Sequence, residues 1–255
     1  MNVLVCVKRV AMVGAKIVIT PDGQDIDTRH LGFTISPHEE CAIEEAVRIV
    51  EHHGGTVSVL TLGPSEAVEQ LRDAAATGAS RLLHLQGGER EWDPIATAQA
   101  IAEAVATREE ADGAYDLILF GNEAPDTGDY QVGIRVAHLL GRPCVSGAKY
   151  LELSDGRAQV RREFRGGDEF FEFDLPGVVA VKEGINLPRY PSLPGRMRAK
   201  KATIDESEPR WREGALHKQR LSVPSTTRER AELLGTGVAA VPALLALLER
   251  LGVLA

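Results

Sequence analysis

The sequence predicts an α/β fold in which helices cover both faces of a mainly parallel sheet. Short apolar runs at residues 3–7, 56–62, 81–85 and 117–120 have the continuous pattern of strands that are buried on both faces. The segments between these runs carry apolar residues at the helical spacing. Repeated strand–helix units of this length require parallel strands that are joined by right-handed crossovers.

The predicted helices of the first half begin at recognisable capping residues. Ser36 is an N-cap residue, followed by Pro37 at the first helical position and by Glu39 where a capping box requires an acidic side chain. Asp93, which also precedes a proline, starts the helix after the third strand. Gly54 ends the first of these helices. These signals fix the order of strand and helix through the first half of the chain.

A polar loop follows the strand at residues 117–120 and leads directly into an amphipathic helix. The loop consists of small and polar residues, and Val132 and Val136 lie on the apolar face of the helix behind it. In open α/β sheets, ligands bind just past the carboxyl ends of strands, where a helix N-terminus offers backbone N–H groups to an anion. The loop therefore predicts a candidate pocket whose polarity suits a nucleotide.

The pattern changes after about residue 144. Residues 150–153, 159–164 and 169–173 alternate between apolar and polar side chains, which predicts antiparallel strands. Residues 178–181 form one more buried strand. We therefore expect an α/β nucleotide-binding domain over residues 1–183.

Residues 184–255 are expected to form an extended C-terminal arm. Prolines interrupt residues 184–230 without a sustained period, and an irregular stretch of that length is unusual inside a compact domain. We expect the arm to lie on a partner subunit. Leu193 has no evident core role and suits an anchor in a partner's pocket. The basic cluster nearby is interpreted as a docking patch, and the short helix at 238–251 is too apolar to be free in solvent.

The composition excludes several functional classes. The formal net charge of −8 argues against a nucleic-acid-binding surface. No apolar run approaches the roughly 18 residues that are needed to span a bilayer, and the N-terminus resembles a core strand rather than a signal peptide. Cys6, Cys41 and Cys144 are interpreted as reduced cysteines rather than disulfide or metal ligands. We therefore expect a soluble cytoplasmic protein without a metal site.

No catalytic motif is found in the sequence. It lacks a Gly-x-Ser-x-Gly elbow, a Walker A loop and a Gly-x-Gly-x-x-Gly motif. The acidic pair at residues 39 and 40 is interpreted as a helix-start feature. Lys8 and Arg9, at the end of the first strand, could reach a phosphate or a partner's carboxylate, or could be exposed to solvent, and both interpretations stay open.

Three segments resemble the beta subunit of electron transfer flavoprotein. VLVCVKRV, at residues 3–10, resembles that family's opening strand. ISPHEECAIEEAVRI, at residues 35–49, resembles its segment of a proline followed by a helix. INLPRYPSLPGRMRAKKA, at residues 185–202, is the most specific of the matches. The resemblance covers roughly residues 1–204 in order.

The resemblance implies a Rossmann-like, mainly parallel α/β fold of the adenine-nucleotide-binding type, with antiparallel additions and an extended C-terminal arm. It implies a heterodimer in which an alpha subunit holds most of an FAD and the beta subunit buries a second adenine nucleotide, usually AMP. Such a protein is an electron carrier and not an enzyme. It accepts electrons from acyl-CoA or related dehydrogenases and passes them to a membrane quinone oxidoreductase.

The family's functional residues carry over to this sequence by position. The implied cofactor-binding residues are Cys6, Ser36, Pro37, His38, Glu39, Leu62, Gly121, Asn122, Glu123, Ala124, Asp126, Thr127, Gly128, Asp129, Tyr130, Gln131 and Val132. The implied partner-docking residues of the recognition loop are Leu193, Arg189, Tyr190, Lys200 and Lys201. No catalytic residue and no metal ligand is implied.

Three alternatives stay open at this point. Gln131-Val132-Gly133 is closer to the electron-bifurcating branch of the family, whose second nucleotide is FAD, but the residues before it differ from that branch. We favour AMP and keep FAD as the alternative. A stand-alone nucleotide sensor resembling universal stress proteins would leave Leu193 and the basic cluster unexplained. An adenylating enzyme ranks third, because no Gly-rich motif follows the first strand.

Overall fold

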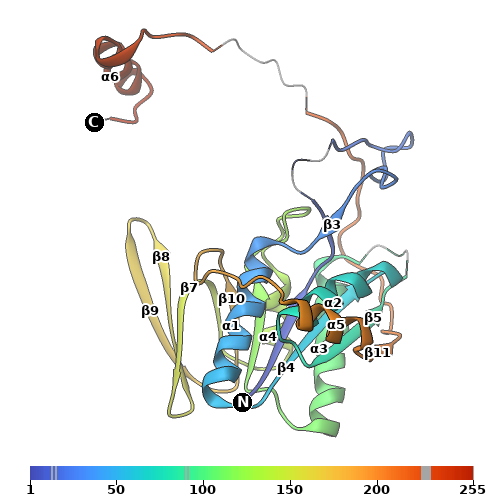
Figure 1. The fold of residues 1–255 in the computed structure, drawn as a ribbon. Coiled ribbons are helices and arrows are strands. Elements are labelled where there is room, and N and C mark those ends of the chain that lie inside the picture. Colours follow the sequence, from blue (N-terminus) through green and yellow to red (C-terminus); the bar gives the residue numbers. More distant parts are fainter. Residues whose placement is uncertain (13, 15, 89, 91, 225–230, 255) are drawn as a thin grey trace. The chain divides into compact units, whose positions relative to one another are not determined.

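A computed structural model of the chain describes residues 1–12, 14, 16–88, 90, 92–224 and 231–254. The described residues form two compact units, Met1–Gln219 and Arg220–Ala255. The first unit holds a sheet flanked by helices (Figure 1). The second unit contains a short helix.

Within the described residues, the first unit contains a nine-stranded sheet with the order β11-β5-β4-β1-β6-β10-β7-β8-β9. The strands from β11 to β7 are parallel neighbours, whereas β7, β8 and β9 pair antiparallel. The predicted α/β class with antiparallel additions is confirmed. The strand bounds are β1 Asn2–Val7, β4 Thr56–Gly63, β5 Arg81–Gln86, β6 Leu117–Gly121, β7 Cys144–Ser154, β8 Arg157–Phe164, β9 Gly167–Asp174, β10 Gly177–Val181 and β11 Ile204–Ser207. A separate ladder pairs β2 Val10–Ala11 with β3 Phe33–Thr34.

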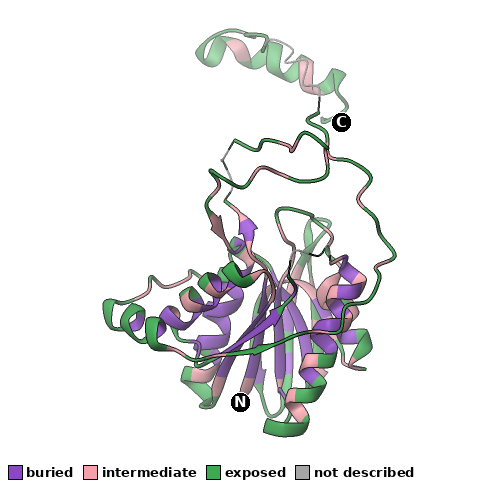
Figure 2. Cartoon of the chain, turned by 90° about the vertical axis from the view of Figure 1, so that its right-hand side faces the viewer, coloured by how far each residue is buried: buried purple, intermediate pink, exposed green. Residues whose placement is uncertain are grey.

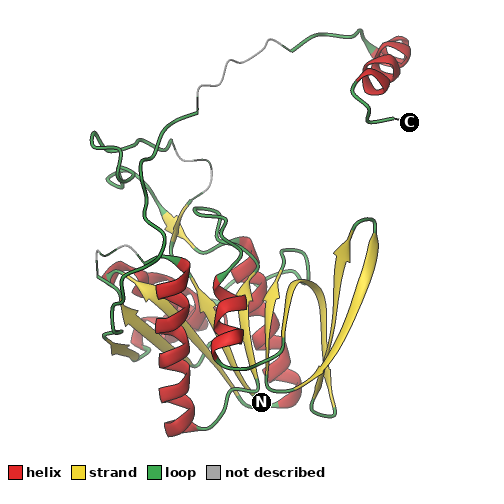
Figure 3. Cartoon of the chain, turned by 180° about the vertical axis from the view of Figure 1, so that it is seen from behind, coloured by secondary structure: helices red, strands yellow, loops and turns green. Residues whose placement is uncertain are grey.

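Helices cover both faces of this sheet, as the repeated strand–helix pattern predicts (Figure 3). They are α1 Pro37–His53, α2 Val68–Thr77, α3 Pro94–Asp112, α4 Val132–Leu139 and α5 Leu193–Lys201, with a 3-10 turn η1 Ser65–Ala67 before α2. Apolar residues of α1 and α2 share one buried cluster with the sheet, and those of α3 and α4 share a second. The side chains of β1 alternate between the two clusters, which is expected of a strand covered on both sides.

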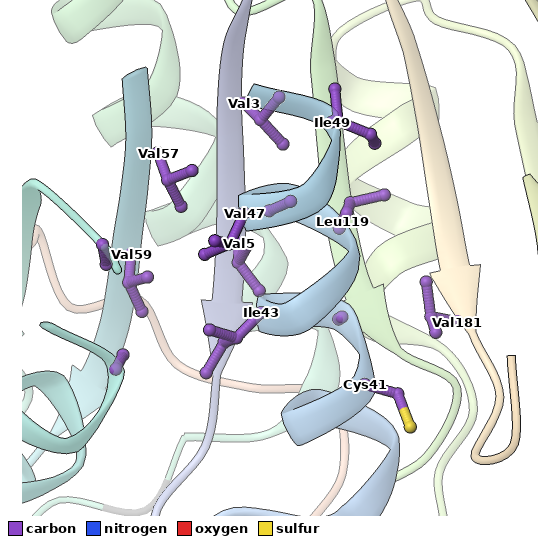
Figure 4. Packing of buried hydrophobic residues seen from close by; sticks show 14 of the residues in the cluster. Val3, Val5, Cys41, Ile43, Val47, Ile49, Val57, Val59, Leu119 and Val181 are labelled. Atoms are coloured by element: carbon purple, nitrogen blue, oxygen red, sulfur yellow. The ribbon is translucent and has the colours of Figure 1, made fainter. Parts of the chain in front are cut away.

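The main core lies between α1 and the centre of the sheet. Ile43 and Val47 of α1 lie beside Val5 of β1, and Leu119 and Val181 continue the same apolar layer (Figure 4). These side chains are buried, and burial is concentrated in the strands and in the helix faces directed at them (Figure 2). This packing fixes α1 over the middle strands, so its N-terminus stands at their carboxyl ends.

The predicted helix starts are confirmed. Ser36 Oγ accepts a hydrogen bond from the Glu39 backbone N–H, and the Glu39 carboxylate accepts one from the Ser36 N–H, which completes the capping box of α1. Asp93 caps α3 through the N–H of Ala96, with Pro94 at the first helical position. Gly54 follows the last residue of α1.

The prediction of an irregular segment after residue 184 is wrong for residues 193–207. Residues 193–201 form α5, and β11 pairs in parallel with β5 at the edge of the sheet. The buried positions of α5 are Gly195 and Ala199, and such small residues give no apolar helical signal. β11 reads Ile-Asp-Glu-Ser and lacks the pattern of a buried strand. Residues 225–230, also within the predicted irregular stretch, lie outside the described residues.

The second unit carries η2 Gly237–Ala240 and α6 Val241–Arg250, so a helix is present in the predicted range 238–251. Leu244 and Leu245 of α6 are each nearly half exposed in this chain. None of the helices in the described part of the chain has the length and hydropathy required of a membrane-spanning helix.

Candidate functional site

The strand order creates a crevice at the centre of the sheet. From β1 the chain moves outward in one direction to β4 and β5, and then returns to β6 on the other side of β1. Connections therefore leave β1 and β6 toward opposite sides, and ligands of open α/β sheets bind at such a point. A cavity of about 290 Å³ lies at the carboxyl ends of these strands.

Most of the implied cofactor-binding residues line this cavity. They are Cys6, Glu39, Leu62, Gly121, Asn122, Glu123, Ala124, Thr127, Asp129, Tyr130, Gln131 and Val132. The remaining ones, Ser36, Pro37, His38, Asp126 and Gly128, belong to the same two segments but do not line it. The structure thus brings together segments that lie more than a hundred residues apart in the sequence.

Several helices begin at the cavity. Its wall includes Glu39 from the first turn of α1, Pro94 and Thr97 from the first turn of α3, and Val132 and Gly133 from the first turn of α4. The first N–H groups of a helix have no partner within the helix and carry a partial positive charge. The cavity therefore favours a ligand with an anionic group, such as a phosphate.

Glu39 joins the start of α1 to the end of β1. Its Oε2 accepts a hydrogen bond of 2.7 Å from the Ser36 N–H, and its Oε1 accepts one of 2.7 Å from the Lys8 N–H. The side chain is buried, and burial raises the pKa of Glu39 to about 7, although the hydrogen bonds from the Ser36 and Lys8 backbone oppose that rise. The carboxyl group thus fixes the backbone beside the cavity and titrates near neutral pH.

Gly121 allows β6 to approach α1. A Cβ atom at this position would lie 2.6 Å from Glu39 Cγ and 3.3 Å from His38 Cβ. Only glycine avoids this overlap without a shift of α1. A glycine is therefore required for steric reasons at the start of the polar loop. Its small size lets the loop approach the first turn of α1.

His38 connects the loop to the segment that follows β10. Its Nδ1 accepts a hydrogen bond of 2.7 Å from the Glu183 N–H, so the neutral ring carries its proton on Nε2. Nε2 lies 3.2 Å from Glu123 Oε1, which can accept that proton in a hydrogen bond. His38 thus orders the loop from behind the cavity wall.

Two further polar contacts fix the loop. Lys8 Nζ lies 2.7 Å from Asp126 Oδ2, and Asp126 Oδ1 accepts a hydrogen bond from the Thr127 N–H. Gln131 Oε1 accepts hydrogen bonds of 3.0 and 2.8 Å from Nε and Nη2 of Arg135, one turn further along α4. Lys8 therefore pairs with a carboxylate of the loop within the chain itself.

The part of the cavity wall that follows β5 was not predicted from the sequence. Arg90 and Trp92 line the cavity, and Trp92 Nε1 donates a hydrogen bond of 3.0 Å to the Gly87 carbonyl. A signal was available, because β5 is parallel to β4 and the Asp93 cap places the next helix start at the same edge.

Arg9 also lines the cavity. Its guanidinium carbon lies 3.4 Å from the centroid of the Phe33 ring. Within the described residues, its buried Nε has no hydrogen-bond partner, and burial lowers the pKa of Arg9 below its ordinary value. Arg9 thus places a cationic side chain in the cavity wall.

The implied docking residues lie on a different part of the first unit. Leu193, Tyr190, Lys200 and Lys201 are exposed, Leu193 in the first turn of α5 and the lysines in its last turn. The guanidinium of Arg189 instead points at α1, where it bonds to Glu44 and Glu51. Among the described residues, no group of three or more His, Cys, Asp or Glu side chains is placed to hold a metal ion.

Comparisons of this chain with a family model and with individual proteins all indicate the same family. Residues 25–210 match the family model described as Electron transfer flavoprotein domain. The chain is 38% identical over 210 residues to electron transfer flavoprotein subunit beta of Bacillus subtilis (strain 168), covering 82% of this chain and 79% of that protein. It is 35% identical over 213 residues to the mitochondrial subunit beta of Oryza sativa subsp. japonica, covering 82% of each chain. It is 34% identical over 213 residues to subunit beta of Homo sapiens, again covering 82% of each chain.

Proposed function

The chain belongs to the family of electron transfer flavoprotein beta subunits, and from this premise we propose that its cavity binds one AMP. A subunit of this family takes part in electron transfer as a carrier and is not itself a catalytic enzyme. The alpha subunit is its partner in a heterodimer. The redox chemistry is supplied by an FAD held mainly by that alpha subunit, and this chain contributes one wall of the flavin site.

The position and the donors of the cavity carry the proposal. The cavity lies at the switch point of the sheet, where α1, α3 and α4 begin. A phosphate fits there because the starts of α1, α3 and α4 and the cationic side chain of Arg9 all contribute to the cavity wall. Trp92 and Ile101 give the wall an apolar part that suits a base.

The size of the cavity favours AMP over FAD. Its volume of about 290 Å³ is at the lower end of the range for small-molecule sites. An FAD has more than twice the non-hydrogen atoms of AMP and would need a larger site. We therefore assign the mononucleotide a structural role: it holds the polar loop and the helix starts together.

The partners follow from the proposed role. Acyl-CoA or related dehydrogenases donate electrons, and a membrane quinone oxidoreductase accepts them. The exposed Leu193 and its flanking Lys200 and Lys201 form the docking surface for the donor. We place the heterodimer in the cytoplasm, where its free thiols Cys6, Cys41 and Cys144 stay reduced.

The test is the nucleotide content of the heterodimer. The chain is co-purified with its alpha partner, the complex is denatured, and the released nucleotides are quantified by chromatography. We expect one FAD and one AMP per heterodimer. We also expect that joint replacement of Asp126 and Gln131 by Ala lowers the AMP to less than about half, because each side chain fixes the loop through a charge-assisted hydrogen bond.

The matched control replaces Glu110 and Gln159 by Ala, an acid and an amide that are both exposed and outside the cavity wall. Full AMP content in the Asp126 and Gln131 variant would show that the loop does not hold the nucleotide. Two FAD per heterodimer would replace the proposal by the bifurcating type. Failure to form a complex, with ATP bound to this chain alone, would favour the nucleotide sensor.

A further inference from the structure

The segment at residues 186–201, which we name the docking segment, is bound to the body of the first unit at several points. It comprises an extended stretch and the helix α5, and it carries the exposed Leu193. At its start, Asn186 Nδ2 donates hydrogen bonds to the Cys41 carbonyl and to Glu45 Oε2 on α1. The docking segment is therefore tied to α1 before α5 begins.

Arg189 makes the most extensive of these contacts. Its Nε and Nη2 donate to the two carboxylate oxygens of Glu44 at 2.9 and 3.0 Å, and its backbone N–H donates to Glu44 as well. Its Nη1 and Nη2 also donate to the two oxygens of Glu51 at 2.6 and 2.9 Å. Glu44 is buried, and the carboxylates of Glu51 and Glu44, which accept these hydrogen bonds, raise the pKa of Arg189.

A second arginine holds the far end of α5. Arg72 of α2 donates from Nη1 to the carbonyl oxygens of Ala199 and Lys200 at 2.8 and 3.0 Å. Both carbonyls belong to the last turn of α5, and the Ala199 carbonyl also accepts a hydrogen bond from the N–H of the C-cap residue Ala202. Arg72 thus caps the C-terminus of α5 from the neighbouring helix.

The face of α5 directed at α2 consists of small residues. Gly195 and Ala199 are its buried positions, and a Cβ atom at Gly195 would overlap the carbonyl oxygen of Ala76. Ser192 caps the N-terminus through the Gly195 N–H. The backbone of α5 therefore lies directly against the end of α2, which leaves little room for another orientation.

The large apolar residues of α5 lie on its outer side. Leu193 and Met197 are one helical turn apart and are 74% and 61% exposed. This is the reverse of an ordinary surface helix, whose large apolar residues face the core. Lys200 and Lys201 are exposed one turn further along. The outer side of α5 thus offers two neighbouring apolar side chains next to positive charge.

We propose that Arg189 and Arg72 are positioning residues that hold α5 so that Leu193 and Met197 form a preformed docking surface for the electron donor. The donor then offers an apolar pocket with an acidic rim, which complements the outer side of α5. A surface ordered before the encounter avoids the entropy cost of ordering it on binding. This inference rests on the proposed docking role of Leu193.

The test uses conservative variants in the heterodimer with its flavin. Arg189→Lys keeps the charge but loses the forked geometry. With an acyl-CoA dehydrogenase as electron donor, we expect the KM for that donor to rise about fivefold, with kcat unchanged, because ordering cost is added to binding only. The flavin spectrum stays the same. Hydrogen exchange of the α5 amides becomes about tenfold faster without any donor present.

A double-mutant cycle separates positioning from general stability. If Arg189 acts through the docking surface, Arg189→Lys raises the KM in full in the wild-type background but by clearly less in the Leu193→Ala background, where only Met197 of the apolar pair is left to position. If the fold-increases in KM of the two single variants multiply in full in the double variant, the inference is overturned. Glu51→Gln is the milder second variant if Arg189→Lys does not fold, because Glu51 is largely exposed. Arg72→Lys is expected to behave like Arg189→Lys.

The matched controls are Arg81→Lys and Leu139→Ala. Arg81 forms an ion pair with Asp112, away from the docking segment, and Leu139 is an exposed leucine of α4 that lies outside both the docking segment and the cavity wall. Both are expected to leave the KM unchanged. An unchanged KM in Leu193→Ala would refute the docking role in the proposed function. A raised KM in Leu193→Ala, with normal KM and exchange in Arg189→Lys, would refute the positioning role alone.

Discussion

Glu39 illustrates at the scale of one residue how the capping of a helix and the shaping of a site can be the same interaction. The capping box predicts the bond between Glu39 and the Ser36 N–H, and the structure adds the bond to the Lys8 N–H. The second bond joins residues 31 positions apart and follows only from the packing of α1 over β1. One buried carboxyl group thus closes the helix start and fixes the end of the central strand.

The raised pKa of Glu39 gives a prediction about stability. Its pKa in the folded chain, about 7, lies above the ordinary value of 4.5, so between these values the folded chain binds a proton that the unfolded chain has lost. In this pH range Glu39 is ionised in the unfolded chain but still protonated in the folded chain. The free energy of unfolding therefore falls as the pH rises from 4.5 to about 7. We expect Glu39→Gln to remove this part of the pH dependence, up to roughly 3 kcal/mol.

Urea unfolding followed by circular dichroism between pH 5 and 8 measures the effect. As the pH rises, the free energy of unfolding of the wild type should fall relative to that of Glu39→Gln. Glu110→Gln, which changes an exposed glutamate, is the control and should give no such shift. Parallel pH profiles for the wild type and Glu39→Gln would show that Glu39 titrates at its ordinary pKa.

At the scale of elements, the meeting of β6 and α1 depends on Gly121. We expect Gly121→Ala to lower the free energy of unfolding by roughly 1–3 kcal/mol, because the added Cβ overpacks against Glu39. The control is Gly167→Ala, where the nearest atom to the added Cβ would be 3.9 Å away. The two variants are compared by their midpoints of urea unfolding. Equal midpoints would mean that α1 moves away from β6 without cost.

Elements with a strong periodic or capping signal could be predicted, and those without one could not. The strands of the parallel core and the helix starts at Ser36 and Asp93 follow from local patterns. α5 could not be predicted from periodicity, because its inner face is Gly195 and Ala199 and its large residues face outward. β11 is stabilised by pairing with β5, a partner more than a hundred residues away, and its own sequence is mostly polar.

The candidate site shows the same division. The loop at residues 121–132 is adjacent to a clear strand and could be placed at the sheet's carboxyl edge from sequence alone. For Arg90 and Trp92, the strand before them and the Asp93 cap after them indicate the same edge of the sheet, but that they line the cavity follows only from the strand order. The direction of the Arg189 side chain depends on which face of α1 is turned toward it, and a sequence pattern does not give this.

At the scale of the whole molecule, the chain forms two compact units, and the first unit ends at Gln219. We expect a chain truncated after Gln219 to keep the thermal midpoint of the first unit within about 3 °C, because the second unit is compact by itself. We also expect it to co-purify less well with the alpha subunit, since α6 exposes apolar side chains that suit a partner. Thermal circular dichroism and co-purification measure the two effects.

A shorter chain, ending after Glu208, is the matched comparison. It also removes the N–H groups of Ala215 and Leu216, which donate to Asp93 Oδ2 at the start of α3. Its thermal midpoint should fall by about 5 °C or more, since a buried carboxylate oxygen loses its donors. Equal midpoints for the two truncations would show that residues 209–219 do not stabilise the first unit.

Both ends of the sheet have a consequence for the behaviour of the protein in a crowded solution. Open strand edges are templates for pairing with other chains, and natural proteins protect them with charges. In this sheet β11 ends one side with Asp205 and Glu206, and β9 ends the other with four acids, Asp168, Glu169, Glu172 and Asp174. A foreign strand would have to align beside these carboxylates at either border. The protein therefore exposes Leu193 and Met197 on α5, where we propose that the electron donor binds, while its sheet resists aggregation through its edges.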